Sequence, residues 1–423
     1  MRATYGLHFW EKALDTPTAR QCFPWRSLTG AWLDMYSDCT HADLDRWIRG
    51  CTSVIESGKR ESRKNRAIAY SSRGVAYWKK SEYDRAIADY TEAIALDPND
   101  AIAYSNRGAA YKKKGEVDRA IADYTKAVAL DLNYANAYAN RGLAYYVEGD
   151  FDLAIADFDK AIALNPNDAI AYDSRGSAYR EKGDFDHAIA DYTKAIAVDP
   201  KYARAYNNRG AAYRKKGVVD RAIADFDISI TLDPDDAIAY TLRGNAYYVK
   251  AEAVRAIADY DKAIALNPKD AVAYYNRGLA YRTKGEGDRA IADFDKAIAL
   301  NPNGAIAYDS RGNAYREKGD FDHAVDDFDK AIAVDPKYAR AYNNRGTAYR
   351  KKGDFDHAVD DFDKAIAVDP KYARAHYNRG VAYARKGDKE RAIADFRKAL
   401  EIDPSYQNAK KGLKRLGVTP EQD

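Results

Sequence analysis

A 34-residue motif that recurs without insertion constrains this sequence more than any other feature. The segment from Ala67 to Asp100 is followed by nine further copies, so that ten copies fill residues 67–406. A period of this length is typical of a solenoid, in which each unit buries its apolar face only against its neighbours. Separate globular domains, the other solution open to a chain of 423 residues, would not repeat in this way. Positions within each copy are numbered 1 to 34, starting at Ala67 and its equivalents.

Each copy predicts two helices joined by a turn. Apolar residues at positions 1, 4, 8 and 11 fall on one helical stripe, and those at positions 20, 24, 27 and 28 fall on another. Gly at position 15 of most copies separates the helices, and Pro at position 32 ends the second one. Gly at position 8 stands inside a helix, where it costs about 1 kcal/mol relative to Ala. Its repetition therefore indicates that the paired helices approach each other closely.

The repeated positions also carry a known signature, with aromatics at 4 and 24, Gly at 8, Tyr at 11, Ala at 20 and 27, and Pro at 32. Residues 67–406 therefore resemble the tetratricopeptide (TPR) repeat family. The resemblance implies an all-α, right-handed superhelical solenoid of ten tandem helix-turn-helix repeats. Departures are few: Leu132 replaces the Pro, Ser229 replaces Ala at position 27, and His376 replaces the aromatic at position 4.

The two ends of the array differ from the repeats. Residues 407–423 resemble the polar helix that closes such arrays. Residues 43–66 contain a degenerate half-repeat and a linker, since residues 43–58 align with a second helix. Residues 1–42 match nothing and are expected to be poorly ordered. The phrase GCTSVIESG before the first full repeat resembles alphaproteobacterial TPR-array proteins of unassigned role, many of which are exported.

The sequence leaves the compartment open. No apolar run is long enough to span a membrane, and Glu11 and Lys12 interrupt the N-terminal apolar stretch too early for a signal-peptide core. This pattern predicts a cytoplasmic protein, in which Cys22, Cys39 and Cys51 would be free thiols. The resemblance to exported proteins keeps a second arrangement open, a Cys39–Cys51 disulfide in the periplasm, which would require a different start or export signal.

Nothing in the sequence indicates catalysis. An active site needs an irregular set of polar residues, whereas here nearly every polar residue has a copy 34 residues away. His187, His323 and His357 all stand at position 19 and are expected to be separate surface residues, so neither a metal nor a cofactor is predicted. Arg at position 7 and Asp at position 23 occur in all ten copies, which favours a structural pair in each repeat.

The resemblance implies where a ligand binds. In TPR proteins the first helix of each repeat lines a concave groove for extended peptides through positions 2, 5, 6, 9, 12 and 13. Asn is frequent at position 6, and its amide can both donate to and accept from a peptide backbone. The predicted peptide-binding residues are Asn106, Asn140, Asn208, Asn276, Asn344 and Asn378 with Lys112, Arg180, Arg214, Arg282, Arg316, Arg350, Arg204, Arg340 and Arg374.

The six groove positions are far more basic than the whole chain. They carry fourteen Lys and Arg against four Asp and Glu, although the formal net charge of the chain is +3. Such a surface favours acidic protein partners. Solvated side chains without a partner, an RNA-binding solenoid and a non-catalytic subunit of a larger enzyme remain alternatives. RNA is less favoured because the groove offers few aromatics for stacking: Trp78, Tyr146, Tyr248, Tyr275 and Tyr377.

One stretch of the array is expected to be soft. Position 17 normally places an aromatic between the paired helices, as Phe321 does in repeat eight. Repeat six has Ala253 there and Ala251 in place of the turn Gly, and repeat seven has Gly287. Missing side chains weaken a solenoid locally. The sequence therefore predicts a hinge over residues 251–287.

Overall fold

The computed structural model describes Cys39 and residues 42–419. Of residues 1–42, the segment expected to be poorly ordered, only Cys39 and Ala42 are described. Cys22 therefore lies outside the described residues. The described part is helical throughout and contains no strand, which confirms the all-α prediction. It divides into two compact units, residues 1–208 and 209–423.

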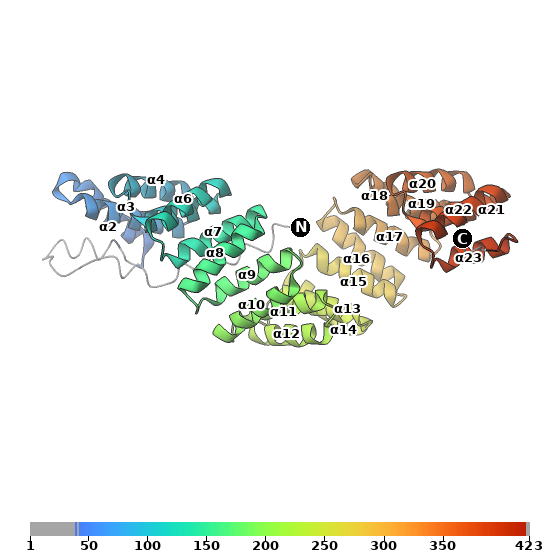
Figure 1. The fold of residues 1–423 in the computed structure, drawn as a ribbon, viewed down its shortest axis with the longest axis horizontal. Helices are drawn as coiled ribbons and strands as arrows, with labels where there is room; N and C mark the ends of the chain where they lie inside the picture. The colour runs from blue at the N-terminus through green and yellow to red at the C-terminus, as the bar shows by residue number, and fades with distance from the viewer. Residues whose placement is uncertain (1–38, 40–41, 420–423) are drawn as a thin grey trace. The chain divides into compact units, whose positions relative to one another are not determined.

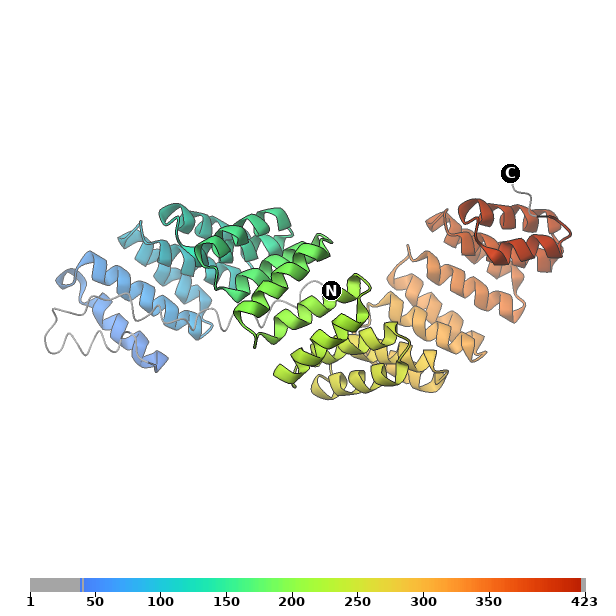
Figure 2. The same ribbon diagram turned by 60° about the horizontal axis from the view of Figure 1, so that its bottom comes forward.

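Every repeat forms the predicted pair of helices (Figures 1 and 2). The first helices are α3 (Arg63–Lys79), α5 (Ala101–Lys113), α7 (Ala135–Glu148), α9 (Ala169–Glu181), α11 (Ala203–Lys215), α13 (Ala237–Val249), α15 (Ala271–Thr283), α17 (Ala305–Glu317), α19 (Ala339–Lys352) and α21 (Ala373–Lys386). The second helices are α4 (Tyr83–Leu96), α6 (Val117–Leu130), α8 (Phe151–Leu164), α10 (Phe185–Val198), α12 (Val219–Leu232), α14 (Ala253–Leu266), α16 (Gly287–Leu300), α18 (Phe321–Val334), α20 (Phe355–Val368) and α22 (Lys389–Ile402). Before them come α2 (Leu44–Glu56) and the 3-10 turn η2 (Gly58–Arg60), and α23 (Gln407–Arg415) follows.

The interior of each hairpin is a glycine facing an aromatic ring. Phe328 and its equivalents at position 24 are almost fully buried. A Cβ added to Gly312 would lie 2.8 Å from a carbon of the Phe328 ring, and one added to Gly176 would lie 2.9 Å from the Tyr192 ring. Because no side chain fits in that space, the position-8 glycines are required by packing, as the sequence indicates.

The Arg and Asp that occur in every copy pair within their own repeat. In repeat seven, Arg277 donates from Nε and Nη2 to the two carboxylate oxygens of Asp293 at 2.8 and 2.7 Å. Its third nitrogen, Nη1, reaches Asp261 of the preceding repeat at 2.6 Å. Asp293 is buried, so this bidentate pair is a strong one. The arginine therefore joins the two helices of its hairpin and also links that hairpin to its predecessor.

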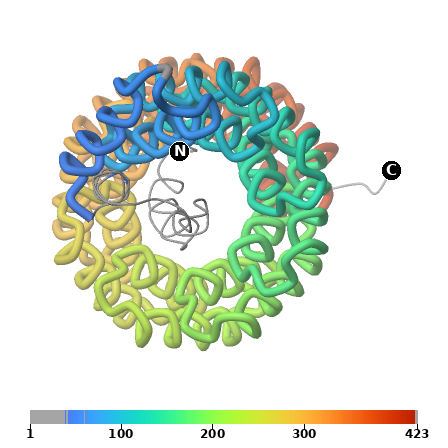
Figure 3. Tube along the Cα trace, turned by 90° about the vertical axis from the view of Figure 1, so that its left-hand side faces the viewer, coloured from blue at the N-terminus to red at the C-terminus, as the bar shows by residue number. Residues whose placement is uncertain are grey.

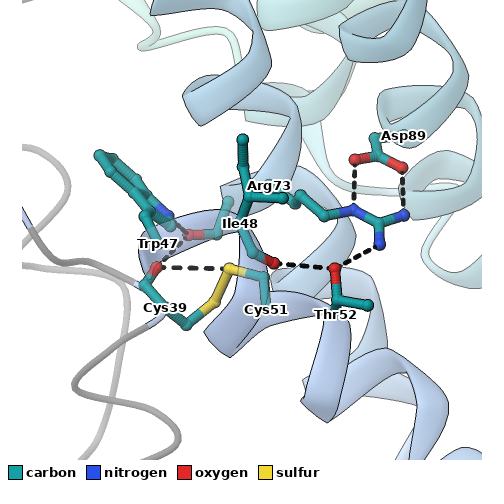
Figure 4. Close-up of a disulfide and its surroundings, with 8 residues drawn as sticks. Cys39, Trp47, Ile48, Cys51, Thr52, Arg73 and Asp89 are labelled. Carbon is teal, nitrogen blue, oxygen red and sulfur yellow. Dashed lines mark hydrogen bonds and ion pairs between the residues drawn. A yellow bond between two sulfur atoms is a disulfide. The ribbon is translucent and has the colours of Figure 1, made fainter. Parts of the chain in front are cut away.

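Helix α2 packs against the first repeat in the way that the second helix of each repeat packs against the repeat that follows it. Arg73 Nη1 donates to Thr52 at 2.9 Å, as Arg107 Nη1 donates to Thr91 at 3.1 Å. The structure also joins Cys39 to Cys51 in a disulfide, the second of the two arrangements that the sequence left open (Figure 4). Both cysteines are fully buried. The disulfide therefore ties residue 39 to the helix that covers the start of the array.

The last repeat is covered in a related way. Helix α23 buries Ala409 and Leu413. They belong to the same apolar cluster as Phe396 of α22, and a Cβ on Gly412 would lie 2.9 Å from the Phe396 ring. The helix thus shields the apolar face that the final hairpin would otherwise expose.

Each unit curves toward its first helices. Successive first helices contact each other from α3 to α9 in one unit and from α13 to α21 in the other, whereas no contact of that extent joins successive second helices among the described residues. The first helices are therefore the more closely spaced set and lie on the inner side of each curved stack. The succession of hairpins can be followed along the tube in Figure 3. We call the side of the first helices the inner surface.

Repeat six has open space where the sequence lacks an aromatic. A depression of about 570 Å³ is lined by residues 251–255 with Thr283 and Lys284. Ala251 takes the left-handed backbone conformation with φ +60°, which the glycines of most other repeats adopt without a Cβ. The boundary between the two compact units lies at residue 208, outside residues 251–287. The hinge thus remains a prediction, and these two features are its local basis.

Candidate peptide-binding surface

The six predicted groove positions are not equally accessible. Position 5 is mostly buried, and Asp309 and Asp173 there have no exposed surface. Side chains at position 12 are half-buried, and the last repeats bury positions 6 and 9 more fully, as at Asn344 and Asn313. Side chains at positions 2 and 13 are the most exposed. A ligand on the inner surface would therefore meet positions 2, 12 and 13 first.

The asparagines at position 6 act largely between repeats. Asn208 and Asn344 donate from Nδ2 to Asp173 and Asp309 at 2.7 and 2.6 Å. Asn276 donates to Asn245 at 2.9 Å and Asn378 to Asn343 at 2.8 Å, each time in the preceding repeat. Asn344 and Asn378 are also buried. The expectation that these four amides are free to serve a peptide backbone therefore does not match the geometry.

Asn106 and Asn140 fit that expectation better. Both are half-buried, and no hydrogen bond of either amide to another described residue is seen. They lie in α5 and α7, and position 5 of the preceding repeats carries Ser71 and Ser105 in place of an Asp or Asn. The ladder is thus internal where position 5 or 9 of the preceding repeat carries an Asp or Asn, and open at Asn106 and Asn140, where neither position does.

The arginines at position 12 carry buried nitrogen on the inner surface. The Nε atoms of Arg214, Arg316 and Arg350 are buried without a hydrogen-bond partner among the described residues. Burial lowers the pKa of the Arg316 guanidinium; the carboxylates of Glu317 and Asp309 oppose that shift, and the nearby cations Arg282 and Arg374 add to it. Burial likewise lowers the pKa of Arg350. At Lys112, burial and then the neighbouring Lys113 lower the ammonium pKa well below its ordinary value.

The most elaborate polar group on the inner surface surrounds Asp309. Its carboxylate accepts from Asn344 at 2.6 Å and from Asn313 at 3.2 Å, and it pairs with Arg340 Nε at 3.2 Å. Arg316 Nη2 donates to the Asn313 side chain at 2.7 Å. Burial raises the pKa of Asp309, although the surrounding arginines oppose that shift. We call these five residues the Asp309 cluster.

A related group surrounds Asp173 in the other unit. Asp173 accepts from Asn208 at 2.7 Å, pairs with Arg204 Nε at 3.3 Å and accepts from the Tyr202 hydroxyl at 3.4 Å. Arg180 Nη1 donates to the Asn208 side chain at 3.2 Å. These five residues form the Asp173 cluster. The contacts of Asp173 and Asp309 were not predicted from the sequence, where the two residues counted only as negative groove charges. The signal was present as an Asp at position 5 with an Asn 35 residues later.

Ion pairs change the prediction for four of the basic residues. Arg204 and Arg340 pair with the buried aspartates, Arg180 lies 3.1 Å from Glu181, and Arg282 lies 3.8 Å from Glu317. These partners are the four acidic residues of the predicted groove. The carboxylates are thus balanced locally, and the remaining ten basic residues of the groove set carry its net positive charge.

The histidines do not form a site. His187, His323 and His357 are each about two-thirds exposed, and each Nδ1 lies 2.7 Å from an Asp at the start of its own helix. Among the described residues, no group of His, Cys, Asp or Glu could hold a metal ion. A search of the same residues finds no helix with both the length and the apolar character needed to cross a bilayer.

Comparisons with known proteins agree with this architecture. Family models described as tetratricopeptide repeat match residues 135–168, 203–236, 271–303 and 344–406. Another, described as TPR repeat, matches residues 74–115, 108–149, 176–217, 255–285 and 312–352. Together these matches cover well over half of the chain. No curated protein is similar enough in sequence to count as a match.

Among solved structures, the chain is similar to one in the APC/C hetero-tetramer Cut9-Hcn1. The identity is 17% and the TM-score 0.50, over 91% of this chain and 95% of that one, a likeness that shows the fold alone. A tetratricopeptide repeat protein from Parabacteroides merdae ATCC 43184 is 23% identical, with a TM-score of 0.48, over 59% of this chain and 98% of its own. MamA is 39% identical over 39% of this chain and 96% of its own, with a TM-score of 0.36. With the ten helical hairpins and the family matches taken together, the chain belongs to the tetratricopeptide repeat family.

Proposed function

We propose that this protein is a non-catalytic interaction scaffold that binds extended, acidic segments of partner proteins on its inner surface. TPR proteins are in general scaffolds of this kind, and the repeats offer no irregular polar constellation for catalysis. The observation that carries the acidic preference is the set of arginines at position 12. Arg214, Arg316 and Arg350 hold buried guanidinium nitrogens that lack hydrogen-bond partners among the described residues.

A partly buried cation is costly where burial outweighs its neighbouring anions, and a ligand carboxylate relieves that cost. Burial already lowers the pKa of Arg316 and Arg350, which means that their charged forms are poorly solvated. A carboxylate can bind a guanidinium through two parallel hydrogen bonds, so an acidic side chain supplies both an opposite charge and additional acceptors. Acidic peptides are favoured over neutral ones for both reasons.

The aromatic side chains of the inner surface do not favour the RNA alternative. Tyr275 packs on Phe294 with ring centroids 5.7 Å apart, and its hydroxyl lies 3.1 Å from Ser310. Tyr377 lies between Phe396 and Tyr406 at 5.6 and 5.4 Å. Rings held in this way do not present an open face on which a base could stack.

Affinity capture with the full chain tests the proposal. The wild-type protein and a variant with Arg214, Arg316 and Arg350 changed to Glu would be used as baits, and the captured proteins identified by mass spectrometry. Segments of those proteins would then be synthesised and measured by fluorescence anisotropy at low and high salt. We expect acidic segments to bind the wild type, more weakly as salt rises, and not to bind the variant. Equal binding to both proteins at low salt would contradict the basic-surface proposal, with helix content by circular dichroism as the folding control.

A further inference from the structure

One row of side chains on the inner surface changes character along the second unit. Position 2 of repeats six to ten carries Ile238, Val272, Ile306, Arg340 and Arg374. The three aliphatic side chains are 43%, 41% and 55% exposed, although residues of this kind are usually buried. The helices that carry the row, α13 to α21, contact one another in succession. The row is therefore continuous, with an apolar half followed by a basic half.

Arginines from outside the position-2 row add positive charge near its basic half. The charges of Arg282 and Arg374 lie close enough to Arg316 to lower its pKa, and those of Arg340, Arg316 and Arg282 lie close enough to Asp309 to oppose the rise in its pKa. We call Arg282, Arg316, Arg340 and Arg374 the arginine cluster. Asp309 pairs directly with Arg340 at 3.2 Å and has no exposed surface. Glu317 lies 3.8 Å from Arg282, so two carboxylates face the four guanidinium groups and the arginine cluster keeps an excess of positive charge.

The same block occurs earlier in the chain without that excess. Residues 136 positions before Arg316 and Arg340 are Arg180 and Arg204, but those before Arg282 and Arg374 are Tyr146 and Ile238. Arginines at these two sites are therefore not needed to build the buried Asp and its partners, because the Asp173 cluster forms in a block whose sequence has Tyr146 and Ile238 at the corresponding positions. Their presence near Asp309 is an addition to a working scaffold.

We infer that the second unit recognises a bipartite ligand, an extended peptide with apolar side chains at one end and acidic side chains at the other. This inference rests on the proposed function and deepens it by naming the ligand pattern. The acidic end lies over the arginine cluster, and the apolar end lies along Ile238, Val272 and Ile306. Charge complementarity with the arginine cluster determines the acidic end of the ligand, and burial of the exposed aliphatic row determines the apolar end.

The distance between successive first helices determines the interval between the ligand residues that contact them. Packed helices lie roughly 8–10 Å apart, and an extended chain advances about 3.3 Å per residue. A bound peptide therefore passes one repeat about every three residues. The ligand pattern is three apolar residues at intervals of about three, followed at the same interval by two acidic residues, in either chain direction.

Selection from a library of random 15-residue peptides, displayed against the immobilised full chain, tests the pattern. A double variant with Arg282→Tyr and Arg374→Ile copies the residues of the earlier block. The matched control is Arg255→Tyr with Arg289→Ile, the same exchanges at residues of the second helices that are about two-thirds exposed. Circular dichroism verifies that all three proteins are folded.

We expect the wild type and the control to select apolar–acidic peptides, and the Arg282/Arg374 variant to lose about tenfold in acidic enrichment while it keeps the apolar residues. Acidic peptides that are still enriched by that variant would overturn the bipartite inference alone, since they would bind elsewhere. Acidic peptides without apolar residues at this interval would overturn it as well. A wild type that selects no acidic peptides would overturn the proposed function itself.

Discussion

The Asp173 and Asp309 clusters are two versions of one arrangement, 136 residues apart in the sequence. Each buries an aspartate at position 5, which accepts from an Asn of the next repeat and pairs with an Arg at position 2. They differ in their surroundings, and the arginines at position 12 respond in opposite ways. Burial opposes the charge of Arg180, yet Tyr192, Tyr146 and Glu181 raise its pKa. Burial, with a smaller effect of the cations Arg282 and Arg374, lowers the pKa of Arg316 although Glu317 and Asp309 oppose it.

The difference separates what the fold needs from what a ligand needs. Both units keep the buried aspartate and its hydrogen bonds, so these belong to the packing of the repeats. The extra arginines Arg282 and Arg374 raise the energy of the unliganded surface, because neighbouring like charges repel each other. A scaffold tolerates such a cost where binding relieves it.

Removing the buried carboxylate gives the largest expected effect. Asp309→Leu leaves the amides of Asn313 and Asn344 and the guanidinium of Arg340 without their acceptor, which costs about 2–4 kcal/mol of local stability. Asp173→Leu costs less, because one of its three donors, the Tyr202 hydroxyl, is already distant at 3.4 Å. Hydrogen exchange in α17 and α19, against α9 and α11, measures both losses. Equal losses would remove the distinction between the clusters.

Protonation of the same group is a milder test. Burial raises the pKa of Asp309, so the folded state holds the proton more tightly than the unfolded chain does. The stability that this group contributes is therefore present below the ordinary Asp pKa and is lost as the pH rises through the folded-state pKa. Carboxyl-carbon NMR should give Asp309 a midpoint above the ordinary Asp range, and Asp309→Asn should cost far less than Asp309→Leu at neutral pH.

The buried Asp395 is the internal control for this titration. Burial opposes its ionisation, but His376 and Arg379 lower its pKa. Its NMR midpoint should lie below the ordinary range while that of Asp309 lies above it. The same direction of shift in both residues would contradict the stated causes.

Exchanging position 9 between the clusters has a smaller effect. Asn313 donates to Asp309 and accepts from Arg316, whereas its counterpart Ser177 bonds the Tyr192 hydroxyl at 3.2 Å. Asn313→Ser should cost about 1 kcal/mol, the net value of a hydrogen bond. Adding Phe328→Tyr rebuilds the pair seen in the earlier block and should recover part of that loss. Thermal unfolding followed locally by hydrogen exchange would show whether the second change has any effect.

The helical hairpin could be predicted from the sequence because its pattern of residues occurs ten times. Gly at position 8 and the aromatic at position 24 fix the hairpin, and the confirmed family and fold follow from them. The contacts of Asn344 could not be predicted, since the period of 34 does not show that position 6 of one repeat lies beside position 5 of the repeat before it. The burial of Asp309 could not be predicted for the same reason. The resemblance to alphaproteobacterial proteins stays a prediction.

The smallest expected effect concerns repeats six and seven. Hydrogen exchange should be faster in α14 and α16 than in α10 and α18, because Ala253 and Gly287 stand where other repeats place a Phe. Ala251→Gly should slow exchange in α14 by several-fold, since it removes a positive-φ Cβ that costs about 1 kcal/mol. Uniform protection across the four helices would show that neighbouring side chains fill the space, and the hinge would be dropped.

The affinity of an acidic segment for two matched variants tests the central claim most directly. Arg316→Gln and Arg180→Gln remove the same charge from the same repeat position, one beside Asp309 and one beside Asp173. With a captured acidic segment as the probe, fluorescence anisotropy at low salt should show a loss of about tenfold or more for Arg316→Gln and little change for Arg180→Gln. Equal losses, or none for Arg316→Gln, would contradict the account that the arginine cluster of the second unit binds the acidic ligand.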